Sequence, residues 1–280
     1  DLIISIGQVV PHEVAGMANH AKNIFIGCGG AGIINASHMV GAVCGMESIM
    51  GRDRTPVRAL LDYMAEHFTR HLPICYALTV TTAVSDDITL HGLFIGSERS
   101  AFEQAVALSQ QKNIVHLDRA IGKCVVMLDE REFHSTWLGN KAVYRTRMAI
   151  KDGGELVILA PGVKRFGEDS AVDALLRKYG YRGRDFVLRA VETQEDLKSN
   201  LSAAAHLIHG SSDGRFKITY CTSLLSQEEV EGVGYAWRPL DEALREYAGL
   251  GQGWNTLPGG EVIYYIQNPA LGLWMAEDRA

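Results

Sequence analysis

The sequence predicts an α/β protein built from two α/β domains whose sheets are mostly parallel. In the second half, short apolar runs alternate with helical patterns, which is typical of repeated β-α units. The chain has 280 residues, 47% hydrophobic and 21% charged, enough for one large or two moderate globular domains. We place the boundary where the polar run Gln110–Asn113 ends a helical pattern. Residues 1–113 and 114–280 are therefore expected to form separate domains.

The elements expected in the first half are a strand over Leu2–Val10, helices over Ile33–Met50 and Arg58–Arg70, strands over Ile74–Ala83 and Ile88–Phe94 joined by Ser85-Asp86-Asp87, and a helix over Ser97–Gln111 that Ser97 caps. Those expected in the second half are strands over Lys123–Leu128, Glu155–Ala160, Phe186–Ala190, Phe216–Tyr220 and Glu261–Gln267, with helices over Lys141–Ile150, Ser170–Tyr179, Gln194–His206 and Leu240–Tyr247. The first run, Leu2–Val10, is largely apolar, as in strands covered on both faces. Because the chain opens on Asp1 within this run, we expect a piece of a longer protein, without its N-terminal part and neighbouring strands.

Composition argues against several classes of function. The net charge is −6 and no run of Lys and Arg is present, so nucleic-acid binding is not expected. No apolar run reaches the ~18 residues of a membrane span, and the N-terminus has no basic segment of a signal peptide. Five scattered cysteines without a CxxC pair favour reduced thiols. We therefore expect a cytoplasmic protein with no membrane partner.

One glycine-rich stretch, Gln8–Met46, contains His12, Lys22 and His38. An imidazole such as His12 can serve as a general base, although a single histidine is more often a hydrogen-bonded core residue. Lys22 is either a surface lysine or, once desolvated beside apolar residues, a nucleophile or attachment point. His38 is either a helix-face residue or a metal ligand, but no second ligand stands at zinc spacing.

Further candidates are weaker. The run Gly27–Gly32 has the wrong spacing for a dinucleotide fingerprint, although a phosphate could still fit such a loop. Lys141 opens a predicted helix and is either a solvated lysine or an anchor for a carboxylate. His206 and His209 stand at helical i, i+3 spacing near a helix end, where the helix dipole accounts for them better than a metal.

The stretch PHEVAGMANHAKNIFIGCGGAGIINASH resembles the nickel-dependent lactate racemases and related 2-hydroxyacid racemases and epimerases. In that family, a lysine follows a histidine by ten residues and a second histidine follows sixteen later. His12, Lys22 and His38 keep this spacing. A weaker likeness runs through KAVYRTRMAIKDGGELVILAPG, where Lys141 resembles the family's lysine for the substrate carboxylate.

The resemblance implies an isomerase that inverts C2 of a 2-hydroxy acid by reversible hydride transfer. Its cofactor is the nickel-pincer nucleotide, pyridinium-3-thioamide-5-thiocarboxylic acid mononucleotide carrying nickel. The resemblance assigns the covalent attachment to Lys22, the fourth nickel ligand to His38, and transfer of the substrate's hydroxyl proton to His12. It also implies a substrate site at Lys141 and Trp137, an active-site cleft between the domains, and cofactor-biosynthesis enzymes as partners; a homo-oligomer is left open.

The chain departs from the family at several points. In the family, the second acid/base histidine, the carboxylate-binding arginine and the phosphate-binding part come before the segment that this chain resembles, so this chain alone is expected to be inactive. Leu138 takes the place of a polar residue of lactate racemases, which favours a sugar acid such as an aldonate over lactate. Two other classes stay open: a dehydrogenase or lyase that uses a free dinucleotide, and a non-catalytic protein that binds small acids.

Overall fold

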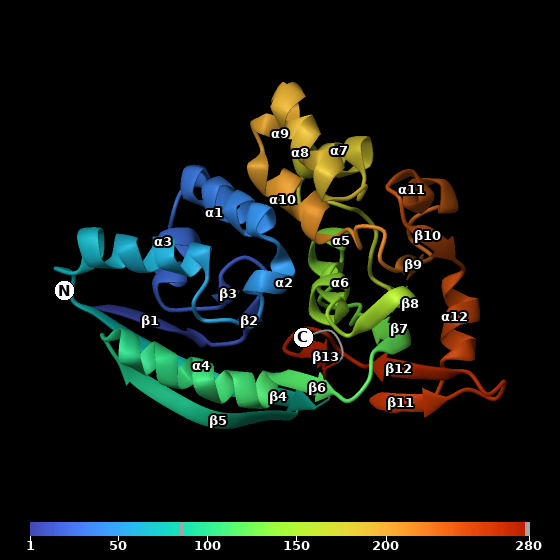
Figure 1. Cartoon of the computed structure of the whole chain (residues 1–280), viewed down its shortest axis with the longest axis horizontal. Coiled ribbons are helices and arrows are strands. Elements are labelled where there is room, and N and C mark those ends of the chain that lie inside the picture. Colours follow the sequence, from blue (N-terminus) through green and yellow to red (C-terminus); the bar gives the residue numbers. More distant parts are fainter. Residues whose placement is uncertain (85–86, 278–280) are drawn as a thin grey trace. The chain divides into compact units, whose positions relative to one another are not determined.

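The computed structural model describes residues 1–84 and 87–277 and divides into two compact units (Figure 1). Unit 1 comprises Asp1–Val115 with Leu271–Leu273, and unit 2 comprises His116–Ala270 with the chain from Trp274 onward. The turn expected around Ser85-Asp86-Asp87 falls largely outside the described residues. In the described ranges, no helix combines the length and the apolar character that crossing a membrane requires.

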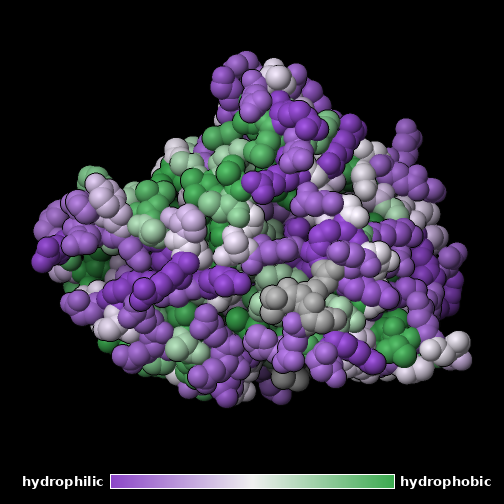
Figure 2. All heavy atoms as spheres, viewed as in Figure 1, coloured by the Kyte–Doolittle hydropathy of each residue, from purple (hydrophilic) through white to green (hydrophobic). Residues whose placement is uncertain are grey.

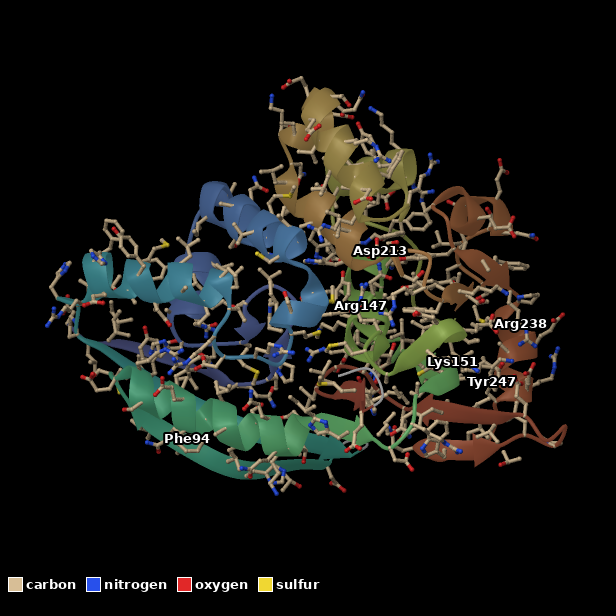
Figure 3. All side chains as sticks on the ribbon, viewed as in Figure 1. Phe94, Arg147, Lys151, Asp213, Arg238 and Tyr247 are labelled. Atoms are coloured by element: carbon tan, nitrogen blue, oxygen red, sulfur yellow. The ribbon has the colours of Figure 1, made fainter. Side chains whose placement is uncertain are left out.

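Unit 1 contains one three-stranded sheet in the order β1-β4-β5, in which β1 is parallel and β5 antiparallel to β4. Helix α4 packs on one face of this sheet, where its Phe102 meets Tyr76 and Leu78 of β4 in the core. Phe94 of β5, labelled in Figure 3, packs against the same core. The elements of this half are β1 (Ile3–Gln8), β2 (Pro11–His12), β3 (Gly16–Met17), the π-helix η1 (Asn23–Gly27), α1 (Ala31–Cys44), α2 (Met46–Ile49), α3 (Pro56–Met64), the π-helix η2 (Ala65–Thr69), β4 (Ile74–Val84), β5 (Asp87–Gly96) and α4 (Arg99–Asn113).

The prediction that the first strand is covered on both faces is wrong for the described chain. Ile6 pairs with Ala77, and Ala77 pairs with Ile95, so these residues share the face opposite α4. Ile6 is 72% exposed and Ile95 is 65% exposed. The apolar run therefore forms a strand of a sheet with only one covered face. The predicted cap of α4 is also wrong, since Glu98 rather than Ser97 holds the N-cap position.

Unit 2 is built on a six-stranded sheet in the order β10-β9-β8-β7-β12-β11, parallel except for β11. This confirms the α/β fold class with mostly parallel strands. Its strands are β7 (Ile121–Met127), β8 (Ile150–Leu159), β9 (Lys217–Cys221), β10 (Ala236–Arg238), β11 (Gly253–Thr256) and β12 (Val262–Ile266), while β6 (Ile114–Leu117) and β13 (Leu273–Ala276) form a separate pair. Its helices are α5 (Thr136–Gly139), α6 (Lys141–Thr146), α7 (Ser170–Tyr179), α8 (Arg184–Thr193), α9 (Glu195–Lys198), α10 (Leu201–His209), α11 (Gln227–Gly232) and α12 (Leu240–Glu246).

Two predicted elements of unit 2 are wrong. The run Phe186–Ala190 is not a strand but part of helix α8, which buries Val187 and Ala190, three residues apart, on one side. The helix predicted over Lys141–Ile150 is too long, because α6 ends at Thr146 and strand β8 begins at Ile150 and runs through Asp152-Gly153-Gly154. The pairing with β7 shifts register there, as the added residues of a β-bulge require.

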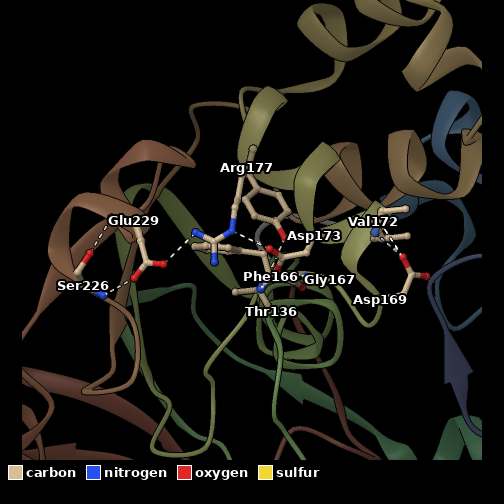
Figure 4. A network of polar contacts seen from close by, with 11 residues as sticks. Thr136, Phe166, Gly167, Asp169, Val172, Asp173, Arg177, Ser226 and Glu229 are labelled. Carbon is tan, nitrogen blue, oxygen red and sulfur yellow. Dashed lines mark hydrogen bonds and ion pairs between the residues drawn. The ribbon is translucent and has the colours of Figure 1, made fainter.

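Polar bonds anchor the segments that carry α5 and α6. Arg147, just after α6, donates to the carbonyls of His209 and Ser211 and lies 3.5 Å from Asp213 (Figure 3). A second network centres on Asp173, which accepts the amide hydrogens of Phe166 and Gly167 and pairs with Arg177 at 2.6 Å (Figure 4).

The Asp173 network fixes the start of α5. The carbonyl of Phe166 accepts a hydrogen bond from the amide of Trp137, so the loop held by Asp173 in turn holds α5. Arg177 extends the network to Glu229 of α11. The sequence gives no sign of this link, because its parts are about thirty to fifty residues apart.

Replacing Asp173 with asparagine is expected to lower the free energy of unfolding by about 1–2 kcal/mol at neutral pH. This value is that of a few charge-assisted hydrogen bonds, reduced because solvent screens the exposed Arg177. Burial raises the pKa of Asp173, but hydrogen bonds from Arg177 and the two amides outweigh it and set that pKa below 3.8. The stabilisation is therefore present above pH 3.8 and is lost as the pH falls through the lower folded-state value. Urea unfolding of wild type and variant at pH 7 and at about pH 3, below the unfolded-state pKa, measures the loss; a difference between the two proteins that grows on acidification contradicts this assignment.

Candidate functional site

The structure places His12, Lys22 and His38 in unit 1, in β2, at the start of η1 and in α1. The strand pair β2-β3 sets His12 opposite Gly16. Gly16 has φ +83°, and a Cβ there would lie 2.1 Å from the carbonyl oxygen of Arg52. Only glycine can fill this position, which fixes the turn that follows His12.

The ring of His12 is held by the main chain just beyond it. Its Nδ1 accepts hydrogen bonds from the amides of Val14 at 3.1 Å and Ala15 at 3.4 Å, and its Nε2 lies 3.9 Å from Glu13. With Nδ1 as acceptor, the neutral ring carries its proton on Nε2. In this form Nε2 can donate a hydrogen bond but cannot take a proton. Proton transfer through Nε2 requires the hydrogen bonds from the two backbone amides to break, at a cost of about 1 kcal/mol each.

Lys22 follows an unusual turn. Asn19 and His20 both have positive φ, 75° and 59°, and both are buried. The side-chain oxygen of Asn19 accepts hydrogen bonds from the His20 amide and from Nδ2 of Asn23, so one side chain bonds the chain on both sides of Lys22. The π-helix η1 then begins, a form that often marks functional sites.

Burial lowers the pKa of Lys22 below its usual 10.5. The carboxylate of Glu13 acts in the opposite direction, and the guanidinium of Arg58 adds to the lowering. A desolvated amine with a lowered pKa is neutral more often than a surface lysine, and the neutral form is the nucleophile.

His38 lies in the third turn of α1, a helix of fourteen residues with no Asp, Glu, Lys or Arg. Its Nδ1 donates a hydrogen bond to the carbonyl of Ile34 at 2.7 Å, which leaves the lone pair of Nε2 for a metal. His67 makes the same kind of bond to Tyr63 at 2.8 Å, but its side chain is exposed. The bond is therefore not a metal-site signature by itself, and His38 differs from His67 by its environment.

The environment of His38 keeps its imidazole neutral. Burial lowers its pKa, against the hydrogen bond to Ile34 and the charge of Glu13, and the charge of Lys22 adds to the lowering. A neutral imidazole is the form that binds metals. Apolar residues gather over α1 on the side of the molecule seen in Figure 2. Glu13 influences the pKa of both Lys22 and His38 and lies next to His12, so the three residues share one electrostatic neighbourhood.

A metal bound at His38 would need further ligands that a cofactor brings with it. In the described ranges, no group of three or more His, Cys, Asp or Glu side chains is arranged to hold a metal ion, so His38 would need ligands from another molecule. The glycine run offers room as well. A Cβ added to Gly27, Gly30 or Gly32 would meet no atom within 4 Å. Gly29 differs, because its Cβ would lie 1.8 Å from the carbonyl oxygen of Phe25.

Lys141 and Trp137, the residues expected to bind substrate, lie in α6 and α5 of unit 2. Asn140, with φ −66° and ψ −2°, is both the C-cap of α5 and the N-cap of α6. Lys141 is therefore the first residue of α6, as predicted, and its role as an anchor for a carboxylate stays a prediction. Its Nζ lies 5.8 Å from the ring centroid of Phe133, within cation–π range.

Trp137 stacks on His206, with ring centroids 4.3 Å apart. The ring nitrogens of His206 bond the hydroxyls of Tyr144 at 2.7 Å and Tyr181 at 3.0 Å. Because both nitrogens have these partners, the metal-ligand interpretation of His206 is wrong. The imidazole of His206 instead stacks against the indole of Trp137.

The structure also brings in residues that sequence reasoning missed. Glu13 stands beside His12 in the sequence and could have been noticed there. Arg58 lies on α3, where a helical pattern suggests a solvated charge, yet it is 1% exposed. Asn19 and His20 have positive φ, and Asn and His are among the non-glycine residues that adopt it more often than others, so this pair was a weak signal.

Comparison with known proteins supports the fold. The sequence matches no model of a protein family. No curated protein matches it either. Among the similar solved structures are a protein from Thermotoga maritima (TM-score 0.85, 21% identity, 99% of this chain and 67% of that one) and the lactate racemase apoprotein from Thermoanaerobacterium thermosaccharolyticum (TM-score 0.70, 15% identity, 98% and 63%). This chain thus spans about two thirds of the length of these proteins, and its fold is lactate racemase-like.

Proposed function

We propose that this chain contributes the cofactor-holding part of a 2-hydroxyacid racemase or epimerase that uses a nickel-pincer nucleotide. The observation that carries the proposal is the pairing of a desolvated amine, Lys22, with a half-buried imidazole, His38, whose Nδ1 is hydrogen-bonded to Ile34 and whose pKa is, like that of Lys22, influenced by Glu13. The lactate racemase-like fold supports it.

Each of these residues has a task within its reach. Lys22 would hold the nucleotide covalently through Nζ, and His38 would bind nickel through the Nε2 that the Ile34 bond leaves open. The open side of the glycine run, at Gly27, Gly30 and Gly32, would leave room for the ring and ribose. When bound, the cofactor supplies hydride acceptance and donation, chemistry that no amino-acid side chain can perform.

The chain's own residues would handle the substrate's oxygen. His12 would take the hydroxyl proton as hydride leaves C2, so that a planar 2-keto acid forms. His12 would then give the proton back to the oxygen, and addition of hydride to either face of the keto acid would yield both configurations. In the tautomer of this structure His12 instead donates from Nε2, so proton transfer would require its ring to leave the amides of Val14 and Ala15.

Trp137 and Lys141 of unit 2 are our candidates for binding the substrate's carboxylate and carbon chain. A lysine supplies a charge for the carboxylate, and the indole, supported by His206, supplies a flat apolar surface. Leu138 beside it, in place of a polar residue, favours a substrate other than lactate, for which an aldonate is our candidate.

The test is a stereochemical assay in D2O with the full-length protein, produced together with the cofactor-biosynthesis enzymes and supplied with nickel. Lactate, malate and aldonates of one C2 configuration are the substrates. We expect one of them to yield both configurations with protium kept at C2, because hydride does not exchange with solvent. Deuterium at C2 would indicate proton abstraction and overturn the hydride mechanism.

The same assay separates the alternatives. Turnover that requires added NAD and no nickel would identify a dehydrogenase or lyase. Binding of the acids without any change at C2 would identify a small-acid binding protein. Either result would replace the racemase proposal.

A further inference from the structure

The turn before Lys22 contains two buried residues, Asn19 and His20, in a strained backbone conformation. Asn19 and His20 are consecutive non-glycine residues with positive φ, and a left-handed residue of this kind costs about 1–3 kcal/mol. Both ring nitrogens of His20 are buried without a hydrogen-bond partner among the residues that the structure describes, and the ring centroid lies 4.2 Å from that of Tyr76 and 5.1 Å from that of Phe102. Such a turn persists only if its surroundings hold it.

The side chain of Arg58 forms hydrogen bonds that hold this turn in place. Its Nη2 donates to the carbonyl of Met17 at 2.6 Å and to that of Asn19 at 3.4 Å, and its Nη1 reaches the same Asn19 carbonyl at 3.5 Å. The guanidinium also lies 4.5 Å from the centroid of the Phe102 ring. It is thus a buried charge hydrogen-bonded to main-chain carbonyls, an expensive arrangement.

The turn is connected directly to Lys22. The Asn23 amide donates to the carbonyl of His20 at 2.9 Å, and Asn23 Nδ2 donates to Asn19 Oδ1 at 2.8 Å. Residues on both sides of Lys22 are therefore tied to the two strained residues. If the turn relaxed, the direction of the Lys22 side chain would change with it.

We propose that Arg58 is a positioning residue which, by holding the carbonyls of Met17 and Asn19, keeps the Asn19–His20 turn strained and thereby aims Lys22 Nζ for attachment of the cofactor. This inference rests on the proposed function for its purpose, while the aiming of Lys22 can be measured without any cofactor.

The chain offers a matched control in Arg99. Its guanidinium lies 5.0 Å from the same Phe102 ring, but its hydrogen bonds go to Asp53 at 2.7 Å and Asp62 at 3.1 Å. Arg99→Met removes a stacked cation from the same core without removing a bond to the turn. A loss shared by both variants would point to packing around Phe102.

The experiment compares full-length wild type, Arg58→Met, Arg99→Met, His20→Gly and the double variant Arg58→Met/His20→Gly, all checked for folding by circular dichroism. Two readouts are taken by peptide mass spectrometry: the rate at which Lys22 acquires the cofactor, and the rate of its acetylation by acetic anhydride relative to exposed Lys112. We expect Arg58→Met to slow attachment about 10–100-fold, the usual cost of a misplaced group, and to change the relative acetylation. Arg99→Met should match wild type in both.

Glycine at position 20 separates positioning from packing. Because glycine adopts φ +59° without strain, His20→Gly should restore attachment and acetylation toward wild type in the Arg58→Met background. Unchanged attachment and acetylation in folded Arg58→Met, or no recovery with glycine, overturns the inference. If Arg58→Met does not fold, Arg58→Lys, which keeps the cation but not the two-carbonyl clamp, replaces it under the same criteria. Absence of cofactor from wild type overturns the proposed function instead, and acetylation still decides the role of Arg58.

Discussion

Replacing His38 with alanine is expected to abolish nickel binding and activity while leaving the cofactor attached to Lys22. His38 is the neutral imidazole whose Nδ1 is bonded to the Ile34 carbonyl and whose Nε2 is left for the metal. Loss of a ligand should cost more than the about 10–100-fold in affinity that loss of a ligand's hydrogen-bond partner costs. Nickel per protein, measured by inductively coupled plasma mass spectrometry after desalting, and the mass of the Lys22 peptide are the two readouts.

His67→Ala is the control for this variant. His67 makes the same bond from Nδ1 to the carbonyl four residues before it, but it lies in an exposed position. Its replacement should leave nickel and activity at the wild-type level. Full nickel content in His38→Ala would contradict the assignment of this residue as a ligand.

Replacing His12 with glutamine is expected to lower kcat about 10²–10⁴-fold, the usual contribution of a general acid–base residue. Glutamine keeps an N–H donor but cannot carry a proton back and forth. The comparison therefore separates the two roles that the structure allows for His12, proton transfer and simple hydrogen-bond donation from Nε2.

The measurement is the rate of C2 inversion at saturating substrate, with cofactor content normalised by mass spectrometry. A His12→Gln enzyme within about tenfold of wild type, less than acid–base catalysis contributes, would limit His12 to orienting the substrate's oxygen. Glu13→Gln is a useful companion, because Glu13 Oε1 lies 3.9 Å from His12 Nε2.

Local patterns in the sequence were sufficient for much of the fold. The alternation of apolar runs and helical patterns predicts the parallel sheet of unit 2, and the hairpin pairing of β4 with β5 follows from two strand-like runs. The strand predicted over Phe186–Ala190 was wrong, because a short apolar run has the same appearance in a strand and in a helix. Its helical nature shows only in the spacing of Val187 and Ala190.

The candidate site was predictable only where it lies close together in sequence. His12, Lys22 and His38 come from one stretch, and the structure keeps them within the influence of Glu13. The hydrogen bonds from Arg58 to the Asn19–His20 turn were not predictable, because Arg58 lies some forty residues after the carbonyls of Met17 and Asn19 that accept them. Tertiary contacts of this kind leave no periodicity in a sequence.

The mass of the peptide containing Lys22 tests the central claim most directly. Full-length protein produced with the cofactor-biosynthesis enzymes should carry the added mass of the pincer nucleotide on Lys22, and Lys112→Ala, which removes an exposed lysine, should carry it too. Lys22→Ala should lack the mass and be inactive while remaining folded. Unmodified Lys22 in protein that inverts C2 of its substrate at full rate would contradict the account.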